Sequence, residues 1–246
     1  MLQHKIRAAC AAAALATAAL SSAALATDDS ISAVVTALDV EPGKHAGSVS
    51  NVNGPTHIKQ GAVVAKVSSV NGPIDLDAQV QAASVTNVNG PIHLGPDTHI
   101  AGTVRTVNGP LHVDSGARIN GEAVSVNGPI DMAGTYIGGG LTTVNGTIKI
   151  VSTRVDHGVA DVNGDIEIGV NSRVDGGLTV HENNSGWFSF LFFRRSLPRV
   201  VIGPGAVVTG TLLFEQEVRL YVSDRATIGP VQGAKAVTFS GDKAPD

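Results

Sequence analysis

The chain has 246 residues, a formal charge of −4, 43% hydrophobic residues and only 4% aromatic residues. Its single cysteine, Cys10, excludes an intramolecular disulfide framework. Because 17 basic residues face 21 acidic ones without a Lys or Arg cluster that could neutralise a row of phosphates, a nucleic-acid partner is disfavoured. Low aromatic content and 29 glycines are typical of one elongated β domain.

Residues 1–26 have the pattern of a secretory signal peptide. Lys5 and Arg7 precede an Ala- and Leu-rich stretch, and Ala24-Leu25-Ala26 forms a small-residue cleavage pattern before Thr27. The apolar run is too short for a comfortable membrane span. We therefore expect a periplasmic or cell-surface protein, exported through a cleaved signal peptide, whose mature chain has no thiol.

Residues 27–180 contain a short internal repeat. The tripeptide Val-Asn-Gly recurs at a nearly constant spacing, at Val52, Val70, Val88, Val107, Val126, Val144 and Val162. A unit this small cannot bury its own apolar face and must stack on its neighbours. The repeat predicts an all-β, single-stranded parallel β-helix (β-solenoid) with three faces. Right-handed winding is the default for such crossovers.

Three apolar clusters in each coil predict three short strands. The fifth and seventh positions alternate with an outward sixth position, as in Ile74-Asp75-Leu76. We expect the Val of each tripeptide to point inward as well. A third inward position is expected at Val63, Val80, Ile100, Ile119, Ile137, Val155 and Val174. Stepping back one repeat from Val52 gives Val34, which predicts an atypical first coil.

The asparagines of the tripeptides are expected to form a structural ladder along one corner. Stacked coils would place them directly above one another, where each amide can donate to one neighbour and accept from the next. The predicted ladder comprises Asn53, Asn71, Asn89, Asn108, Asn127, Asn145 and Asn163. The adjacent Gly removes the Cβ where the chain turns and the coils crowd.

The outward sixth position predicts a column of polar side chains along one face. It reads Asp39, His57, Asp75, His93, His112, Asp131, Lys149 and Glu167. Three interpretations are open: a solvated face of alternating charge, weak binding of zinc or copper, or a catalytic His/Asp pair. We favour the solvated face, and we predict no metal site and no cofactor.

Residues 181–199 interrupt the repeat with an aromatic insertion. Five of the nine aromatic residues of the chain lie within seven positions. The candidate binding residues are Trp187, Phe188, Phe190, Phe192, Phe193, Arg194 and Arg195. They suit a membrane surface or a protein partner, with the guanidinium groups, including that of Arg199, at headgroup or carboxylate level. The alternative is a segment that folds back and caps an open flank of the solenoid.

Residues 200–240 resume coil-like spacing with Ile-Gly-Pro bends, so about two irregular coils and a cap are expected there. Residues 241–246 predict a disordered tail. No catalytic motif is present, and Arg105, Arg118, Arg154 and Arg173 have no obvious carboxylate beside them. These observations predict a protein that is not an enzyme.

The Val-Asn-Gly-Pro-Ile-x-Ile coils, from Val52 to about Val180, resemble a bacterial adhesin-type domain of unknown function built from β-strand repeats. The Ile-Gly-Pro-Gly-Ala-Val-Val-x-Gly stretch at 202–210 resembles the bactofilins, which are polymer-forming β-helices. These resemblances imply an exported binding element of the cell envelope, with an envelope component as its partner. A self-assembling scaffold that forms a homo-oligomer is the first alternative, and a polysaccharide-binding or polysaccharide-cleaving β-helix is the second.

Overall fold

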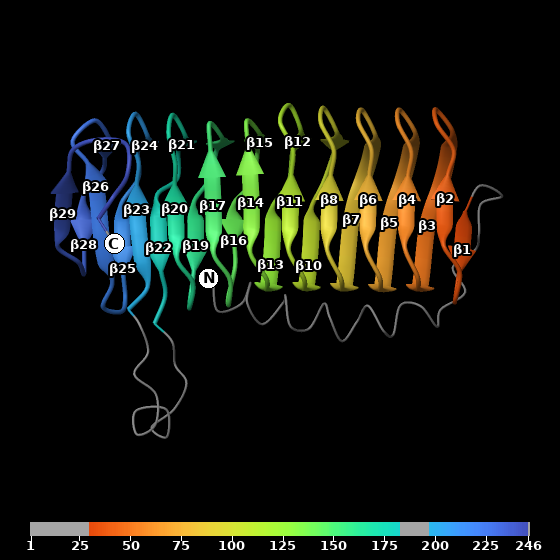
Figure 1. The fold of residues 1–246 in the computed structure, drawn as a ribbon, viewed down its shortest axis with the longest axis horizontal. Coiled ribbons are helices and arrows are strands. Elements are labelled where there is room, and N and C mark those ends of the chain that lie inside the picture. The colour runs from red at the N-terminus through yellow and green to blue at the C-terminus, as the bar shows by residue number, and fades with distance from the viewer. Residues whose placement is uncertain (1–29, 183–196, 246) are drawn as a thin grey trace, which may run out of the picture.

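The computed structural model describes residues 30–182 and 197–245, and these residues form a rod of stacked coils (Figure 1). The chain advances steadily from β1 at one end of the rod to β29 at the other. The described residues contain strands and turns but no helix, and the strands stack in parallel at a spacing of about 18 residues. The predicted parallel β-solenoid is therefore confirmed. It has about 11 turns.

One face of the rod is an 11-stranded sheet, to which each coil gives one strand. Its strands are β2 (Leu38–Val40), β4 (Thr56–Ile58), β6 (Ile74–Leu76), β8 (Ile92–Leu94), β11 (Leu111–Val113), β14 (Ile130–Ala133), β17 (Ile148–Val151), β20 (Ile166–Ile168), β23 (Arg199–Ile202), β26 (Arg219–Ser223) and β29 (Ala236–Phe239).

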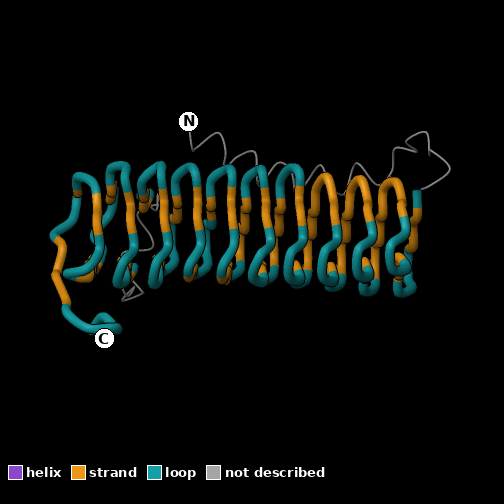
Figure 2. Tube along the Cα trace, turned by 90° about the horizontal axis from the view of Figure 1, so that it is seen from above, coloured by secondary structure: helices purple, strands orange, loops and turns teal. Residues whose placement is uncertain are grey.

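The other two faces belong to one 18-stranded sheet. At the N-terminal end, β1 (Ile31–Ala33) pairs with β3 (His45–Asn53), and three long strands run across both faces: β3, β5 (Val63–Asn71) and β7 (Gln81–Asn89). From β7 onward the faces separate, because β7 pairs with both β9 (His99–Ile100) and β10 (Val104–Asn108). Figure 2 shows the regular alternation of strands and turns from coil to coil.

Two columns of short strands continue from that point. The first runs from β9 through β12 (Arg118–Ile119), β15 (Tyr136–Ile137), β18 (Arg154–Val155), β21 (Arg173–Val174), β24 (Val207–Val208) and β27 (Thr227–Ile228). The second runs from β10 through β13 (Ala123–Asn127), β16 (Leu141–Thr142), β19 (Val159–Asp161), β22 (Leu178–Val180), β25 (Leu212–Phe214) and β28 (Val231–Gln232).

The core is a continuous apolar column along the rod. On the 11-stranded face, the inward Ile74 and Leu76 of β6 pair in register with Ile92 and Leu94 of β8, and all four are buried. The same cluster extends from Leu38 to Val222. Burying one such side chain contributes about 1.5–3 kcal/mol, so stacking of like residues holds the coils together.

The tripeptide valines do not enter this core, so the predicted inward direction is wrong. The residue before each Val is buried instead, whereas Val107, Val126 and Val144 pack with Val124 in a small separate cluster. The prediction carried a period of two straight through the Gly-Pro bend. Thr56, the next inward residue after the bend, follows the inward Asn51 by five positions. Because five is odd, the alternation of inward and outward side chains shifts by one residue at the bend.

A similar one-residue shift applies at Val63. Val64, not Val63, lies in the inward column that continues through Ala82 and Ile100, because Val64 pairs with Ala82 and is buried. Val63 pairs with Gln81 and is only partly covered.

Gly109 shows why the corner requires glycine. Its φ is 154°, and an added Cβ would overlap the carbonyl oxygen of Gly90 in the preceding coil. A side chain cannot be accommodated there. The coils cannot move apart to make room for it, because the parallel strands hold them roughly 4.8 Å apart.

Three strands of the 11-stranded sheet, β23, β26 and β29, follow residue 198, where the sequence predicted about two coils. The described residues of the predicted disordered tail lie against this end of the rod. Arg225 donates to the carbonyl oxygen of Gly241 and to Asp242, and Arg199 donates to the carbonyl oxygens of Ala244 and Pro245. Arg199 also stacks on Tyr221 at 5.4 Å, so its guanidinium is engaged in the rod itself.

Candidate functional site

The asparagine column forms a ladder of side-chain hydrogen bonds along one corner. The amide of Asn71 donates to Asn53 at 2.9 Å, and the amide of Asn89 donates to Asn71 at 2.8 Å. The same bond, at 2.7–2.8 Å, recurs in the four steps from Asn89 to Asn163. Each inner member therefore donates once and accepts once. This ladder ties seven coils together, which confirms the predicted stacking of these asparagines.

A second set of polar side chains supports the same corner from inside. The buried amide of Asn87 donates to the carbonyl oxygens of Gly72, Gly90 and Pro91 at 3.0–3.2 Å, and Asn51 makes the equivalent three bonds two coils earlier. The carbonyl oxygens of Pro55 and Pro91 also accept from the backbone N–H groups of Leu38 and Ile74, so each buried asparagine adds a side-chain donor to its bend. The repeat pattern did not predict that Asn51 and Asn87 bind the bend carbonyls, because the neighbouring Val was expected to point inward.

Asp161 occupies this inward position in the last of the seven coils. It is fully buried, and its carboxylate accepts a hydrogen bond from the backbone N–H of Gly164. Burial raises the pKa of Asp161 to about 7, although backbone N–H groups of Val162, Asn163 and Gly164 oppose the shift. An ionised carboxylate here can accept from these groups but cannot donate to the bend carbonyls as an asparagine does.

The predicted aromatic contact residues, Trp187, Phe188, Phe190, Phe192, Phe193, Arg194 and Arg195, lie outside the described residues. The flanks of this segment are described, however. Ile166 pairs with Val200 and Leu178 pairs with Leu212, so the coil between them is nearly twice as long as its neighbours. A stretch almost as long as a further coil therefore exceeds the usual coil length. Because Val180 pairs with Asp161, the last described residues before it lie at the corner that carries the asparagine ladder.

Three hydrogen bonds lie where the described chain ends before this segment. The Nδ1 of His181 lies 2.9 Å from Glu215, whose carboxylate also accepts from the backbone N–H of Glu182. The hydrogen bond with His181 lowers the pKa of Glu215. Gln216 donates to the carbonyl oxygen of Val162 at 2.5 Å. On the other side of the segment, the backbone N–H of Arg199 donates to Asp165 at 2.7 Å, so the described chain is held on both sides.

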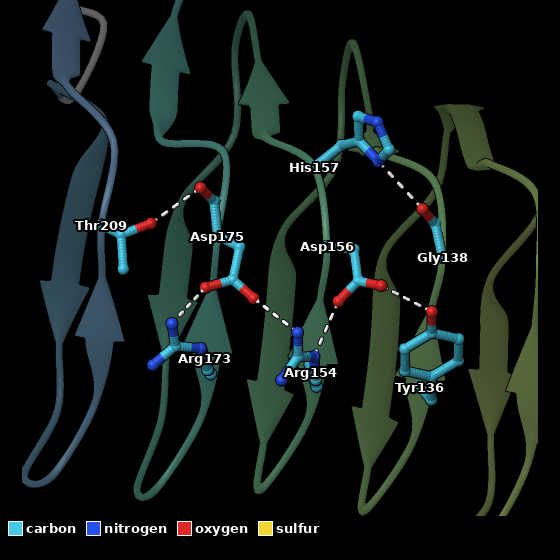
Figure 3. Close-up of polar contacts among 8 residues, drawn as sticks. All are labelled: Tyr136, Gly138, Arg154, Asp156, His157, Arg173, Asp175 and Thr209. Carbon is cyan, nitrogen blue, oxygen red and sulfur yellow. Dashed lines mark hydrogen bonds and ion pairs between the residues drawn. The ribbon is translucent and has the colours of Figure 1, made fainter.

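A network of charged side chains covers a different face. Figure 3 shows Tyr136, Arg154 and Arg173 on successive coils, each beside a carboxylate. Arg154 donates to Asp156 at 2.7 Å and lies 2.9 Å from Asp175, while Arg173 lies 2.6 Å from Asp175. The expectation that these arginines lack a neighbouring carboxylate is therefore wrong. Residues two apart lie on the same side of the chain, so Arg-x-Asp at 154–156 and at 173–175 was the missed signal.

The tyrosine at one end of this network is part of it. The Tyr136 hydroxyl donates to Asp156 at 2.5 Å, and the Arg118 guanidinium stacks over its ring at 4.3 Å. The hydrogen bond raises the pKa of Tyr136 and, with that from Arg154, lowers the pKa of Asp156. Two further bonds cross this surface: Thr209 donates to the Asp175 carbonyl oxygen, and His157 Nδ1 lies 2.9 Å from the Gly138 carbonyl oxygen (Figure 3). The arrangement balances charge and links coils.

Beside this network runs a groove of about 630 Å³. Glycines such as Gly139 and Gly158 line it together with Glu122, His157 and His181.

The sixth-position column lies on the 11-stranded face, and its eight side chains point outward as predicted. Register places Asp39 beside His57 and His57 beside Asp75, and Lys149 lies 3.5 Å from Glu167. The alternation fails at one step, where His93 and His112 pair directly. Asp114 lies within 3.1 Å of both imidazoles. Asp114 follows the end of β11 and falls outside the sixth-position column, so the column did not predict it.

Comparison of the chain with protein-family models, with curated proteins and with solved structures finds no match. The resemblances to adhesin-type repeats and to bactofilins therefore stay predictions. No helix in residues 30–182 and 197–245 is long and apolar enough to cross a membrane.

Proposed function

We propose that the chain is an exported, non-enzymatic binding element of the cell envelope. In this proposal the solenoid is a rigid rod, and the segment at 183–196 is the contact surface that it presents to a membrane. The signal-peptide pattern of residues 1–26 supports export to the periplasm or cell surface.

The observation that carries the proposal is the continuous register on both sides of the long coil. β20 pairs with β23 and β22 pairs with β25 without a break, although the surplus stretch intervenes. The stack therefore closes without those residues. A surplus segment with Trp187, four phenylalanines and two arginines fits a membrane interface, where aromatic rings and guanidinium groups both find partners.

Flotation with phospholipid vesicles tests the proposal. The mature chain, residues 27–246, is expected to float with anionic vesicles, and the same chain lacking residues 187–195 is expected to stay at the bottom of the gradient. The deletion shortens the surplus stretch without using it up, so the coils on either side keep their register. Circular dichroism checks that the variant folds.

A matched control, Arg194→Ser with Arg195→Ser, separates charge from apolar insertion. It is expected to float less with anionic vesicles and to retain the weaker binding to neutral ones. Equal flotation of the mature chain and the deletion variant, or no flotation of either, contradicts a membrane contact at this segment. The segment would then be expected to bind a protein of the envelope and not a membrane.

The exposed ends of the rod favour a second candidate function, an end-to-end scaffold. In the described part of the chain, Val35 at the first coil is 75% exposed and Val237 in the last strand is 51% exposed. The terminal strands β1 and β29 each have a strand partner on one side only. Open parallel edges can add a further strand from another copy. If stacking is the function, Val35→Lys should abolish oligomers that the full chain forms as its concentration rises.

A further inference from the structure

Two histidines are held side by side on the outer surface of the 11-stranded sheet. His93 of β8 and His112 of β11 pair directly in register, and the buried residues on either side of each force both imidazoles outward. Their ring centroids lie 5.4 Å apart at an angle of 45°. The rigid core beneath these strands fixes this spacing, so no rearrangement is needed to bring the rings together.

Asp114 adds a third donor from the same surface. Its Oδ2 lies 3.0 Å from Nε2 of His93, and its Oδ1 lies 3.1 Å from Nε2 of His112. One donor atom from each of the three residues lies within 4.8 Å of the others. Bonds of about 2.0–2.2 Å from a tetrahedral zinc ion place neighbouring ligand atoms about 3.4 Å apart. Small rotations of these three side chains would therefore bring their donor atoms to the separation that a zinc ion requires.

The surroundings suit a cation. Asp75 pairs with His93 on one side of the cluster, and Asp131 pairs with His112 on the other. Two imidazoles and one carboxylate form a donor set that first-row transition ions prefer, whereas calcium and magnesium require mostly oxygen ligands. His93 and His112 are 43% and 58% exposed, so water can occupy the remaining coordination positions.

We propose that His93, His112 and Asp114 form an open zinc-binding site on this face of the rod. The simpler alternative is that Asp114 only accepts a hydrogen bond from each imidazole. The two differ at the Nε2 atoms: a zinc ion must replace the hydrogen at both, whereas the hydrogen-bonded cluster keeps it.

Isothermal titration of the untagged mature chain, residues 27–246, with zinc chloride tests the site. We expect binding of one equivalent, and an affinity at least about tenfold lower for His112→Gln and for Asp114→Asn. His57→Gln is the matched control, because His57 lies in the same column 3.6 Å from Asp75 but has no second imidazole beside it. This variant should bind zinc like the unaltered chain.

A second measurement uses the unaltered protein and does not depend on variants that fold. Zinc should shift the ring ¹⁵N resonances of His93 and His112 and leave those of His57 unchanged. Absence of binding up to about 1 mM zinc, which corresponds to only about −4.1 kcal/mol, overturns the proposal. The proposal is also overturned if His57→Gln loses as much zinc affinity as His112→Gln. Zinc-induced ring shifts at histidines other than His93 and His112 would overturn it too.

Discussion

Replacing Asp161 by asparagine should stabilise the protein above neutral pH. In the native state burial raises the pKa of this carboxyl from 3.8 to about 7. The folded chain then binds the proton more tightly than the unfolded chain does. The contribution of the Asp161 carboxyl to the free energy of unfolding is therefore greatest below about pH 4. It falls between about pH 4 and pH 7 and stays low above that range.

The size of the effect follows from the shift. About three pKa units at 1.36 kcal/mol each give about 4 kcal/mol as the upper limit of the stability lost on ionisation. Asparagine has nearly the same shape and does not ionise. At the equivalent inward position, Asn87 also donates to three bend carbonyls. Asp161→Asn should therefore unfold at higher urea concentration at pH 8, by an amount equivalent to several kcal/mol.

Urea unfolding at pH 4, 6 and 8 measures this difference. Subtracting the wild-type midpoint from that of the variant cancels the titration of all other groups, and midpoints remain useful even where a repeat array departs from two-state unfolding. Asp77→Asn, which alters an exposed carboxylate, is the control. A stability gain that is the same at every pH, or a variant less stable at pH 8, would refute the argument.

Three further predictions concern the corner and the charged face. Asn108→Ala removes two ladder bonds, those with Asn89 and Asn127, and should cost about 1–2 kcal/mol in urea unfolding. Gly109→Ala forces a Cβ onto the Gly90 carbonyl oxygen and should cost at least about 2–3 kcal/mol, measured in the same way. Tyr136 should titrate above the usual tyrosine pKa of about 10, because its hydroxyl donates to Asp156; ultraviolet absorbance follows the phenolate.

Each of these predictions has a matched control. Asn53→Ala removes only one ladder bond, so it should cost about half as much as Asn108→Ala, and equal costs would contradict the ladder. Gly61→Ala meets no atom within 4 Å and should lose only about 1 kcal/mol to backbone strain. In a Tyr221→Phe background the single remaining transition belongs to Tyr136, and Asp156→Ala should move it down. An unchanged transition would show that the hydrogen bond does not form.

The repeat period and the alternation of apolar residues were sufficient to predict the coils, the strands and the outward polar column. These features depend on spacing alone, which a sequence displays directly. The inward direction of Asn51 and Asn87 could not be obtained this way, because the Gly-Pro bend shifts the alternation by one residue. Asp114 lies two residues after His112, so that contact was visible in the sequence, whereas its contact with His93 of the preceding coil depends on how the coils stack.

The charged network illustrates the same limit. Arg154 contacts Asp156 in its own coil and Asp175 in the next one. The first contact is visible as a two-residue spacing, whereas the second needs the register of the coils. The candidate contact segment was found by its composition, and its surplus length became clear only when Ile166 was seen to pair with Val200.

Sedimentation velocity of the mature chain, residues 27–246, and of its variant lacking residues 187–195, at several concentrations and with and without detergent micelles, tests the proposed function most directly. The account predicts an elongated monomer at every concentration that sediments with micelles only when the segment is present. Concentration-dependent oligomers formed equally by both proteins, with no difference in micelle binding, would contradict it and favour the end-to-end scaffold.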